Sequence, residues 1–261
     1  MLLAIDIGNT NIVISVYDSQ QWINTFRYES KDDQPTIYYI NGLSEILLEW
    51  GITPSAIEKT VISSVVPHLN DRIEKAVRAT TGREPHLLGP DDFIALDMHV
   101  PKVYEIGSDL VANAYAALQT YDDDCLIIDF GTALTFTVVS RKHGIEGVTI
   151  APGMLTAMQA LSGNTAQLPE VWLTWPEKAL GKSTEEAIRS GVLIGYYGLV
   201  SELRRQILQQ HPHVNKTIGT GGLVTVLEPL QQELDIVDRN LTLTGLRLIT
   251  EYVNSSQLKP S

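Results

Sequence analysis

Two short Asp-x-Gly sequences in this chain carry the residue types that hold phosphate groups. Each ends an apolar run of strand composition and precedes a second such run, which predicts a β-hairpin with the motif in its turn. Glycine lets main-chain N–H groups approach an anion closely, and Asn or Thr adds a short hydrogen-bond donor. Because a carboxylate repels phosphate, each aspartate implies a cation between the two. The first copy contains Asp6, Gly8, Asn9, Thr10 and Asn11, and the second contains Asp129, Gly131 and Thr132.

The duplication decides how these turns are interpreted, since a single Asp-x-Gly turn is more often structural than functional. The copies stand at matching places in the two halves of the chain. They therefore predict two turns that face each other across a cleft and clamp the phosphates of a nucleotide. A third glycine turn follows a late strand, and its Gly221 and Gly222 would let the main chain lie against the nucleoside.

The elements that must position these turns follow an alternating strand and helix pattern, which predicts the α/β class. The repeat divides the 261 residues into two predicted domains, 1–121 and 122–261. Each half reads as strands, a helix, a further strand and a further helix. Beyond the two hairpins, the sequence predicts strands at 61–66, 144–153 and 217–219, and helices at 70–80, 109–121, 154–161, 184–210 and from 242 onward.

Composition narrows the possible partners and the compartment. The net charge of −12 argues against a nucleic-acid partner, because a phosphate backbone needs a Lys/Arg face and the sequence has no basic cluster. No apolar run reaches the length of a membrane span, and Met1 leads straight into a strand without leader features, so we expect a cytoplasmic protein. Cys125 is the only cysteine, which excludes internal disulfides, and its strand context favours a buried thiol over a reactive one.

Gly107-Ser108-Asp109 opens the Ala-rich helix and has two interpretations. In the structural one, Ser108 or Asp109 is an N-cap, the more frequent role of such residues at a helix start. In the functional one, Asp109 is a general base at a domain junction, where a substrate cleft would lie.

Gly181-Lys182-Ser183-Thr184 resembles the end of a P-loop, but Pro176 stands where that motif needs its first glycine and no strand precedes it. Ser183 with Glu186 three residues later instead predicts a capping box at a helix start. Thr184 would then present its hydroxyl to a ligand beside the helix N-terminus.

Two further patterns in the second half have structural interpretations. Gly191, Gly195 and Gly198 predict close helix packing, within the subunit or across a dimer. His211-Pro212-His213 predicts an exposed loop and not a metal site, because no third ligand lies nearby in the sequence.

Taken together, these residues resemble a type III pantothenate kinase of the actin-like, acetate-and-sugar-kinase superfamily. The resemblance extends from Leu3 to Arg247 and rests on the order of its motifs. Besides the two phosphate turns, they are Ser64-Val65-Val66-Pro67, Gly107-x-Asp109, Asn113-Ala114, Ala151-Pro152-Gly153, Thr165-Ala166-x-Leu168-Pro169, Gly181-Lys182-x-Thr184, Ser190-Gly191, Thr220-Gly221-Gly222-Leu223 and Leu241-Thr242-x-x-Gly245-Leu246.

The resemblance implies two ribonuclease-H-like (actin-like) domains, each a mixed sheet flanked by helices and related by internal duplication. It implies ATP-dependent phosphorylation of the primary hydroxyl of pantothenate, the first step towards coenzyme A, by a homodimer whose substrate site lies near the subunit interface. Its cofactors would be Mg²⁺ and a monovalent cation, K⁺ or NH₄⁺.

The resemblance also assigns roles to individual residues. Asp6 would hold Mg²⁺ through water, with Asn9, Thr10 and Asn11 around the ATP phosphates. Asp129 matches the monovalent-cation ligand, and Thr132 a phosphate contact. On the pantothenate side, Asp109 matches the general base, with Gly107 and Ser108 beside it, and Thr184 matches a contact supplied by the other subunit.

Two positions on the pantothenate side depart from the family pattern. Leu110 stands where the family usually has Arg, and Val100 aligns with the Tyr of a Tyr-x-Asn-Pro segment, for which Tyr104 is the candidate substitute. These departures leave a second hypothesis open, a nucleotide-binding regulatory homologue with weak or no kinase activity. A sugar or acetate kinase has no support, because no sugar-recognition pattern is present.

Overall fold

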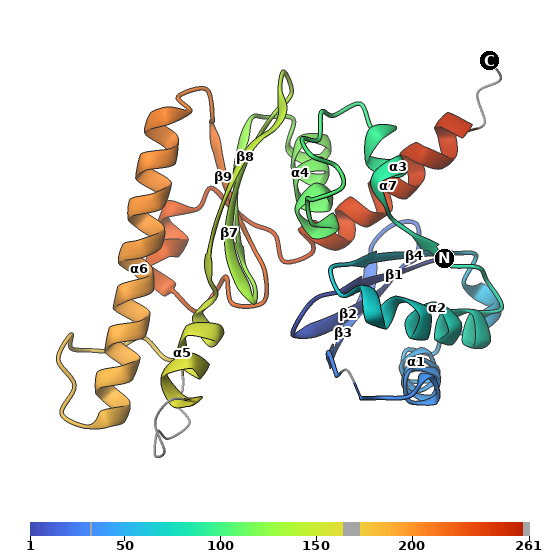
Figure 1. Ribbon diagram of the computed structural model, residues 1–261, viewed down its shortest axis with the longest axis horizontal. Helices are drawn as coiled ribbons and strands as arrows, with labels where there is room; N and C mark the ends of the chain where they lie inside the picture. Colours follow the sequence, from blue (N-terminus) through green and yellow to red (C-terminus); the bar gives the residue numbers. More distant parts are fainter. Residues whose placement is uncertain (32, 164–172, 258–261) are drawn as a thin grey trace. The chain divides into compact units, whose positions relative to one another are not determined.

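A computed structural model describes residues 1–31, 33–163 and 173–257, and Figure 1 traces the chain. The chain divides into two compact units, residues 1–116 with 242–261 and residues 117–241. The last helix therefore groups with the first unit, whereas the predicted boundary after residue 121 left it in the second. Within the described residues, none of the helices combines the length and apolarity that crossing a membrane requires.

The first unit is built on a mixed sheet in the order β3-β2-β1-β4-β5. Its hairpin strands β1, β2 and β3 are antiparallel neighbours, and β4 and β5 continue the sheet in parallel with β1. The strands are β1 (Leu2–Ile7), β2 (Asn11–Tyr17), β3 (Trp22–Glu29), β4 (Lys59–Ser64) and β5 (His86–Leu87).

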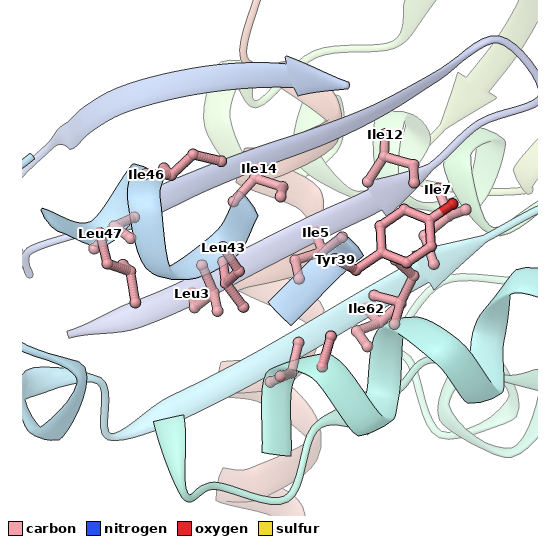
Figure 2. Close-up of a cluster of buried hydrophobic side chains, with 14 of the residues drawn as sticks. Leu3, Ile5, Ile7, Ile12, Ile14, Tyr39, Leu43, Ile46, Leu47 and Ile62 are labelled. Carbon is pink, nitrogen blue, oxygen red and sulfur yellow. The ribbon is translucent and has the colours of Figure 1, made fainter. Parts of the chain in front are cut away.

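Helices α1 (Thr36–Glu49) and α2 (Pro67–Thr81) cover one face of this sheet, with the short helix η1 (Pro54–Ala56) between them in the chain. Alternate apolar residues of the strands point at these helices, as the period of two along a strand requires. Figure 2 shows this core, in which Leu3, Ile5, Ile7, Ile12, Ile14 and Ile62 meet Tyr39, Leu43, Ile46 and Leu47. Every one of these side chains is buried.

The other face of the first sheet carries α7 (Leu241–Gln257). The Arg247 guanidinium lies 4.7 Å from the centre of the Tyr17 ring, and Trp22 Nε1 donates to Thr244 Oγ1 at 3.4 Å. Helix α4 (Ser108–Tyr121) contacts α7 through the hydrogen bond from Thr242 Oγ1 to Asn113 Oδ1, 2.8 Å. These contacts with α4 and with β2 and β3 explain why α7 belongs to the first unit. The short helix α3 (Pro90–Ile94) precedes α4.

The second unit repeats the arrangement with the order β10-β9-β6-β7-β8. Here β6, β7 and β8 form the antiparallel hairpins, and β9 and β10 run parallel to β6 and to each other. The strands are β6 (Cys125–Phe130), β7 (Ala133–Ser140), β8 (Gly144–Pro152), β9 (Lys216–Thr220) and β10 (Ile236–Val237). Read from the opposite end, this order matches that of the first sheet, so the internal duplication is confirmed.

Helix α6 (Thr184–Gln210) packs on one face of the second sheet, with α5 (Met154–Gly163) and η2 (Glu228–Glu233) also in this unit. Its Val192, Leu193 and Val200 join the buried side chains of β6 and β7. Cys125 is buried in β6, where burial raises the pKa of its thiol to about 12, so the buried interpretation is confirmed.

Candidate active site

Asp6 stands at the end of β1 beside Ser63 of β4. The two residues are direct partners in the parallel ladder, so their side chains emerge on the same face of the sheet. Ser63 Oγ donates to Asp6 Oδ1 at 2.8 Å, and Ser63 itself is fully buried. The carboxylate is only partly buried, so the hydroxyl fixes its orientation while leaving it accessible.

Ser108, the first residue of α4, continues this network. Its hydroxyl lies 2.9 Å from Ser63 Oγ, accepts from the Ser64 N–H at 3.1 Å and is 3.2 Å from the Ser64 carbonyl. The start of α4 is thereby joined to the end of β4. A single chain of hydrogen bonds links Ser108 through Ser63 to the carboxylate of Asp6.

Asp109 follows in the first turn of α4. Its Oδ1 accepts from the Leu110 N–H at 2.8 Å, and burial raises the pKa of its carboxyl. Helix α4 begins at Ser108, so neither Ser108 nor Asp109 occupies the position before the helix that an N-cap takes. A raised pKa makes Asp109 a stronger proton acceptor, as a general base requires.

The turn after β1 presents the predicted phosphate-binding residues. The Gly8 N–H donates to the Asn11 carbonyl at 3.0 Å, and Ser30 Oγ donates to the Gly8 carbonyl at 2.6 Å. Asn9 and Asn11 are exposed and Thr10 is partly buried. The main chain of the turn is thus held in place while the amide side chains remain open to a ligand.

Tyr104 lies in the segment between Val100 and α4 and is 79% exposed. Val100 is buried, and Leu110 is partly buried. Tyr104 is therefore accessible to a small molecule, whereas Val100 is not.

In the second unit, Asp129 stands beside Thr220 in the parallel ladder, as Asp6 stands beside Ser63. The chain then turns through Gly221 at φ +92°, a region that favours glycine. A β-carbon on Gly221 would lie 2.4 Å from Asp129 Oδ1 and 2.7 Å from the main chain of Phe130. Only glycine therefore fits against the carboxylate, and Gly222 beside it is exposed.

The turn after β6 holds Gly131 and the exposed Thr132. The Thr132 carbonyl accepts from the Gly153 N–H at 2.9 Å and from Thr156 Oγ1 at 2.8 Å. Tyr196 of α6 donates to the Pro152 carbonyl at 2.6 Å. Helices α5 and α6 thus stabilise the end of β8 against this turn.

The N-terminus of α6 has the Ser183 cap of the predicted capping box, whereas the Glu186 side chain accepts from the residue before the cap. Ser183 Oγ accepts from the Glu186 N–H at 3.2 Å, and a Glu186 carboxylate oxygen accepts from the Lys182 N–H at 2.6 Å. Thr184 is exposed at the mouth of a groove of about 730 Å³ between α5 and α6. The groove is lined by apolar side chains and by Gly191 and Gly195. The predicted motif at 165–169 lies outside the described residues.

Gly191, Gly195 and Gly198 have no atom within 4 Å of where a β-carbon would stand. Among the described residues, nothing packs closely against this stripe of small residues, so the expected packing within the subunit is not observed. The packing across a dimer that the sequence also allowed stays a prediction.

Sequence reasoning missed Ser63 and Ser30, the two serines that hold the first turn and its aspartate. The available signal was a pair of serines ending the apolar strand that includes Val61 and Ile62. A serine there that is buried beside a carboxylate is expected to donate to it. Recognising that required the register between β1 and β4, which the sequence does not state.

The sequence is similar to known proteins over most of its length. Residues 2–206 match the family model described as type III pantothenate kinase. The type III pantothenate kinase of Desulfatibacillum aliphaticivorans is 34% identical over 261 residues, covering 98% of this chain and 100% of the relative.

Solved structures agree with the fold. A conserved putative Baf family transcriptional activator from Campylobacter jejuni superposes with a TM-score of 0.58 at 22% identity, covering 97% of this chain and 99% of the other. The activator of 2-hydroxyisocaproyl-CoA dehydratase from Clostridium difficile, with bound ADPNP, superposes with a TM-score of 0.53 at 12% identity. The match covers 100% of this chain and 98% of the other. At these identities the likeness concerns the fold alone, and the predicted actin-like architecture of two duplicated units is confirmed.

Proposed function

The chain belongs to the type III pantothenate kinase family, and from this premise we propose that it phosphorylates the primary hydroxyl of pantothenate with ATP. The product is 4′-phosphopantothenate, the first intermediate on the way to coenzyme A. The observation that carries the proposal is full-length similarity to a type III pantothenate kinase at 34% identity.

The residues of the first unit supply the chemistry of the acceptor side. Asp109 accepts the proton of the attacking hydroxyl, and its raised pKa matches that task. A β-carbon at Gly107 would lie 2.4 Å from Asp109 Oδ1, so the carboxylate keeps its position only beside glycine. Ser108 anchors this segment to β4, and the exposed Tyr104 provides an adjacent contact.

The donor side consists of the two turns. Gly8, Asn9, Thr10 and Asn11 in one, and Gly131 and Thr132 in the other, bind the phosphates through N–H groups and short polar side chains. Gly221 and Gly222 accommodate the nucleoside. Phosphoryl transfer depends mainly on such positioning and on neutralising charge.

The donor atoms at both aspartates fit metal cations. Asp6 offers an oriented, partly exposed carboxylate oxygen, the ligand type that Mg²⁺ prefers, and would hold Mg²⁺ through water. Asp129 offers a carboxylate oxygen with the main chain of Gly221 close beside it, and would hold K⁺ or NH₄⁺. When bound, these cations neutralise negative charge on the phosphate oxygens.

The groove on α6 supports a homodimer with the substrate site near the interface. Its apolar lining and its small residues Gly191 and Gly195 allow a second helix to approach closely. Thr184 stands beside this groove and contacts pantothenate bound to the partner. A cytoplasmic location fits the single buried, reduced Cys125.

The test is ADP release by the purified protein with and without pantothenate, in potassium and in sodium buffer, combined with light scattering for the oligomeric state. We expect turnover that depends on pantothenate, Mg²⁺ and potassium, from a dimer. ATP binding without acceleration by pantothenate would favour the regulatory hypothesis, which Leu110 and Val100 left open.

A further inference from the structure

Three side chains with metal-binding atoms meet on the surface of the second unit, away from its phosphate turn in sequence. Glu146 belongs to β8, His211 is the C-cap residue that follows α6, and His213 lies in the connection to β9. Glu146 Oε2 is 3.3 Å from His211 Nδ1, and Glu146 Oε1 is 2.9 Å from His213 Nε2. All three ligand atoms lie within 4.8 Å of one another.

The local geometry of the sheet orients the carboxylate of Glu146. Val138 pairs with Gly147 and Val139 with Ile145, so Glu146 is the additional residue of a β-bulge between β7 and β8. Bulges redirect a side chain from the regular alternation of the strand. Ser140 donates a hydrogen bond to the Glu146 carboxylate, which is 15% exposed. The glutamate is therefore oriented and partly buried before any ligand arrives.

The two histidines are held by a tight turn. The His211 N–H donates to the Ile207 carbonyl at 2.9 Å, and the Val214 N–H donates to the His211 carbonyl at 3.1 Å. Pro212 between the histidines fixes its own φ angle. The imidazole rings are inclined at 73° with centres 5.7 Å apart, so they approach the carboxylate from different directions.

One of these separations has the value of a tetrahedral metal site, and the others lie close enough to reach it. With Zn–N and Zn–O bonds of about 2.0–2.2 Å, neighbouring ligand atoms in a tetrahedron stand about 3.3 Å apart. The distance from His211 Nδ1 to Glu146 Oε2 has this value. The other two separations require side-chain adjustments only, since both histidines are partly exposed.

We propose that Glu146, His211 and His213 bind one divalent zinc ion, with water as the fourth ligand. Two imidazoles and one carboxylate suit Zn²⁺ and its neighbours in the transition series, whereas Mg²⁺ prefers oxygen ligands alone. The site is thus chemically distinct from the cation sites at the phosphate turns. The ion joins the end of α6 and the approach to β9 to the β7–β8 hairpin and stabilises the second unit.

The sequence argued against this site because no third ligand lies near the two histidines. The third ligand comes from a residue 67 positions before His213, and only the fold brings it there. Within the part of the chain that the structure describes, no other three His, Cys, Asp or Glu side chains gather their ligand atoms this closely.

The test titrates EDTA-treated, dialysed full-length protein with ZnCl₂ by calorimetry in the absence of ATP. We expect one ion per chain, and no competition from Mg²⁺ at the same concentration. Even partners that only orient a ligand contribute about 10–100-fold to affinity, so His211→Ala, His213→Ala and Glu146→Gln should each weaken zinc binding at least about tenfold.

The matched control is His86→Ala. His86 also pairs with a carboxylate, at 2.9 Å from Asp92 Oδ1, but has no third ligand of the kind described above. It should bind zinc like the unmodified protein. Zinc should raise the unfolding temperature of the unmodified protein and of His86→Ala, but not of His211→Ala.

Cobalt provides a second measurement should a histidine variant fold poorly. Co²⁺ at a site with two imidazoles gives visible absorption bands, which the conservative Glu146→Gln variant should weaken or shift. Absence of stoichiometric zinc binding, or unchanged affinity in all three ligand variants, would overturn the proposal. The cluster would then be a simple ion-pair group in which Glu146 accepts hydrogen bonds from histidine.

Discussion

Asp6 and Asp129 occupy equivalent positions in two equivalent sheets, yet the residues that approach the two carboxylates differ. Each stands beside a hydroxyl residue of the neighbouring parallel strand, Ser63 for Asp6 and Thr220 for Asp129. In the first unit the Ser63 hydroxyl donates directly to the carboxylate. In the second, the chain turns at once through Gly221, whose main chain takes the space beside Asp129.

The turns themselves diverge in the same way. The first is one residue longer, as the pairings of Ile7 with Ile12 and of Phe130 with Leu134 show, and Ser30 ties it to β3. The second is fixed through the Thr132 carbonyl. Duplication has therefore kept the sheet and changed the local contacts, with the Ser63 and Ser30 hydroxyls in the first unit, and the Thr156 hydroxyl and the close main chain of Gly221 in the second. The following variants test whether this difference matters.

The largest expected effect comes from Asp109→Asn in the first unit. Loss of a positioned general base costs about 10²–10⁴-fold in rate, so pantothenate-dependent turnover should fall by that amount. The matched control Asp91→Asn removes an exposed acid from the first turn of α3 and should leave turnover unchanged. Turnover near that of the unmodified protein in Asp109→Asn would contradict the role of base.

Asp109 also sets a pH dependence whose direction follows from its burial. Burial raises its pKa above the ordinary 3.8. As the pH falls, the carboxylate therefore takes up a proton, and stops acting as a base, while the pH is still above 3.8. Turnover should therefore fall on the acid side as pH drops through this raised pKa. The folded state also binds this proton more tightly than the unfolded state, so this group destabilises the fold above its raised pKa. Asp109→Asn should consequently fold at least as stably at neutral pH.

Gly221→Ala tests the main-chain support of the second turn. A β-carbon would clash with Asp129 and Phe130, and the positive φ is strained for alanine, so we expect a loss of about 2–5 kcal/mol in unfolding free energy. Urea denaturation measures it. Gly222→Ala is the control, since its β-carbon would meet no atom within 4 Å. Equal stability of the two variants would show that the close approach is unimportant.

Ser63→Ala tests the hydroxyl support of the first turn. A hydrogen bond to a charged group contributes about 1.5–3 kcal/mol to the unfolding free energy, which the variant should lose. Because Asp6 is then released, the KM for Mg-ATP should also rise. Ser15→Ala is the control, because Ser15 is equally buried but donates to the Asn24 carbonyl, 2.6 Å away. An unchanged KM in Ser63→Ala would mean that the hydroxyl only stabilises the fold.

The sequence predicted most elements, because their signals are local. The boundaries of α6 at residues 184 and 210 were predicted correctly, with the start marked by the Ser183 cap. The strand predicted at 61–66 is observed at Lys59–Ser64, since pairing with Leu2 and Leu3 recruits polar residues at its start. Pro67 then begins α2, so the strand ends before Val65.

Long-range relations could not be predicted in this way. The grouping of α7 with the first unit depends on contacts such as Arg247 with Tyr17, far apart in the chain. The residues of the phosphate turns were recognisable because glycine and aspartate mark them locally. Ser63 and Glu146 were not, because Ser63 reaches Asp6 only through the register of a sheet, and Glu146 reaches its histidines only through the fold.

Exchanging each turn aspartate for asparagine tests whether the two turns hold different cations. Asn keeps a carbonyl ligand but removes the negative charge, and cation affinity depends on ligand charge. Asp129→Asn should raise the potassium concentration for half-maximal activation about tenfold while leaving the Mg²⁺ dependence similar. Asp6→Asn should instead raise the Mg²⁺ requirement, and added potassium should not restore turnover. Activity of the unmodified protein in sodium alone should already be low.

If both variants lose the same ion, the two turns share one cation chemistry and their different supports are interchangeable. If Asp129→Asn is unaffected and sodium serves as well as potassium, Asp129 is a turn residue only, and Gly221 lies against it for reasons of packing.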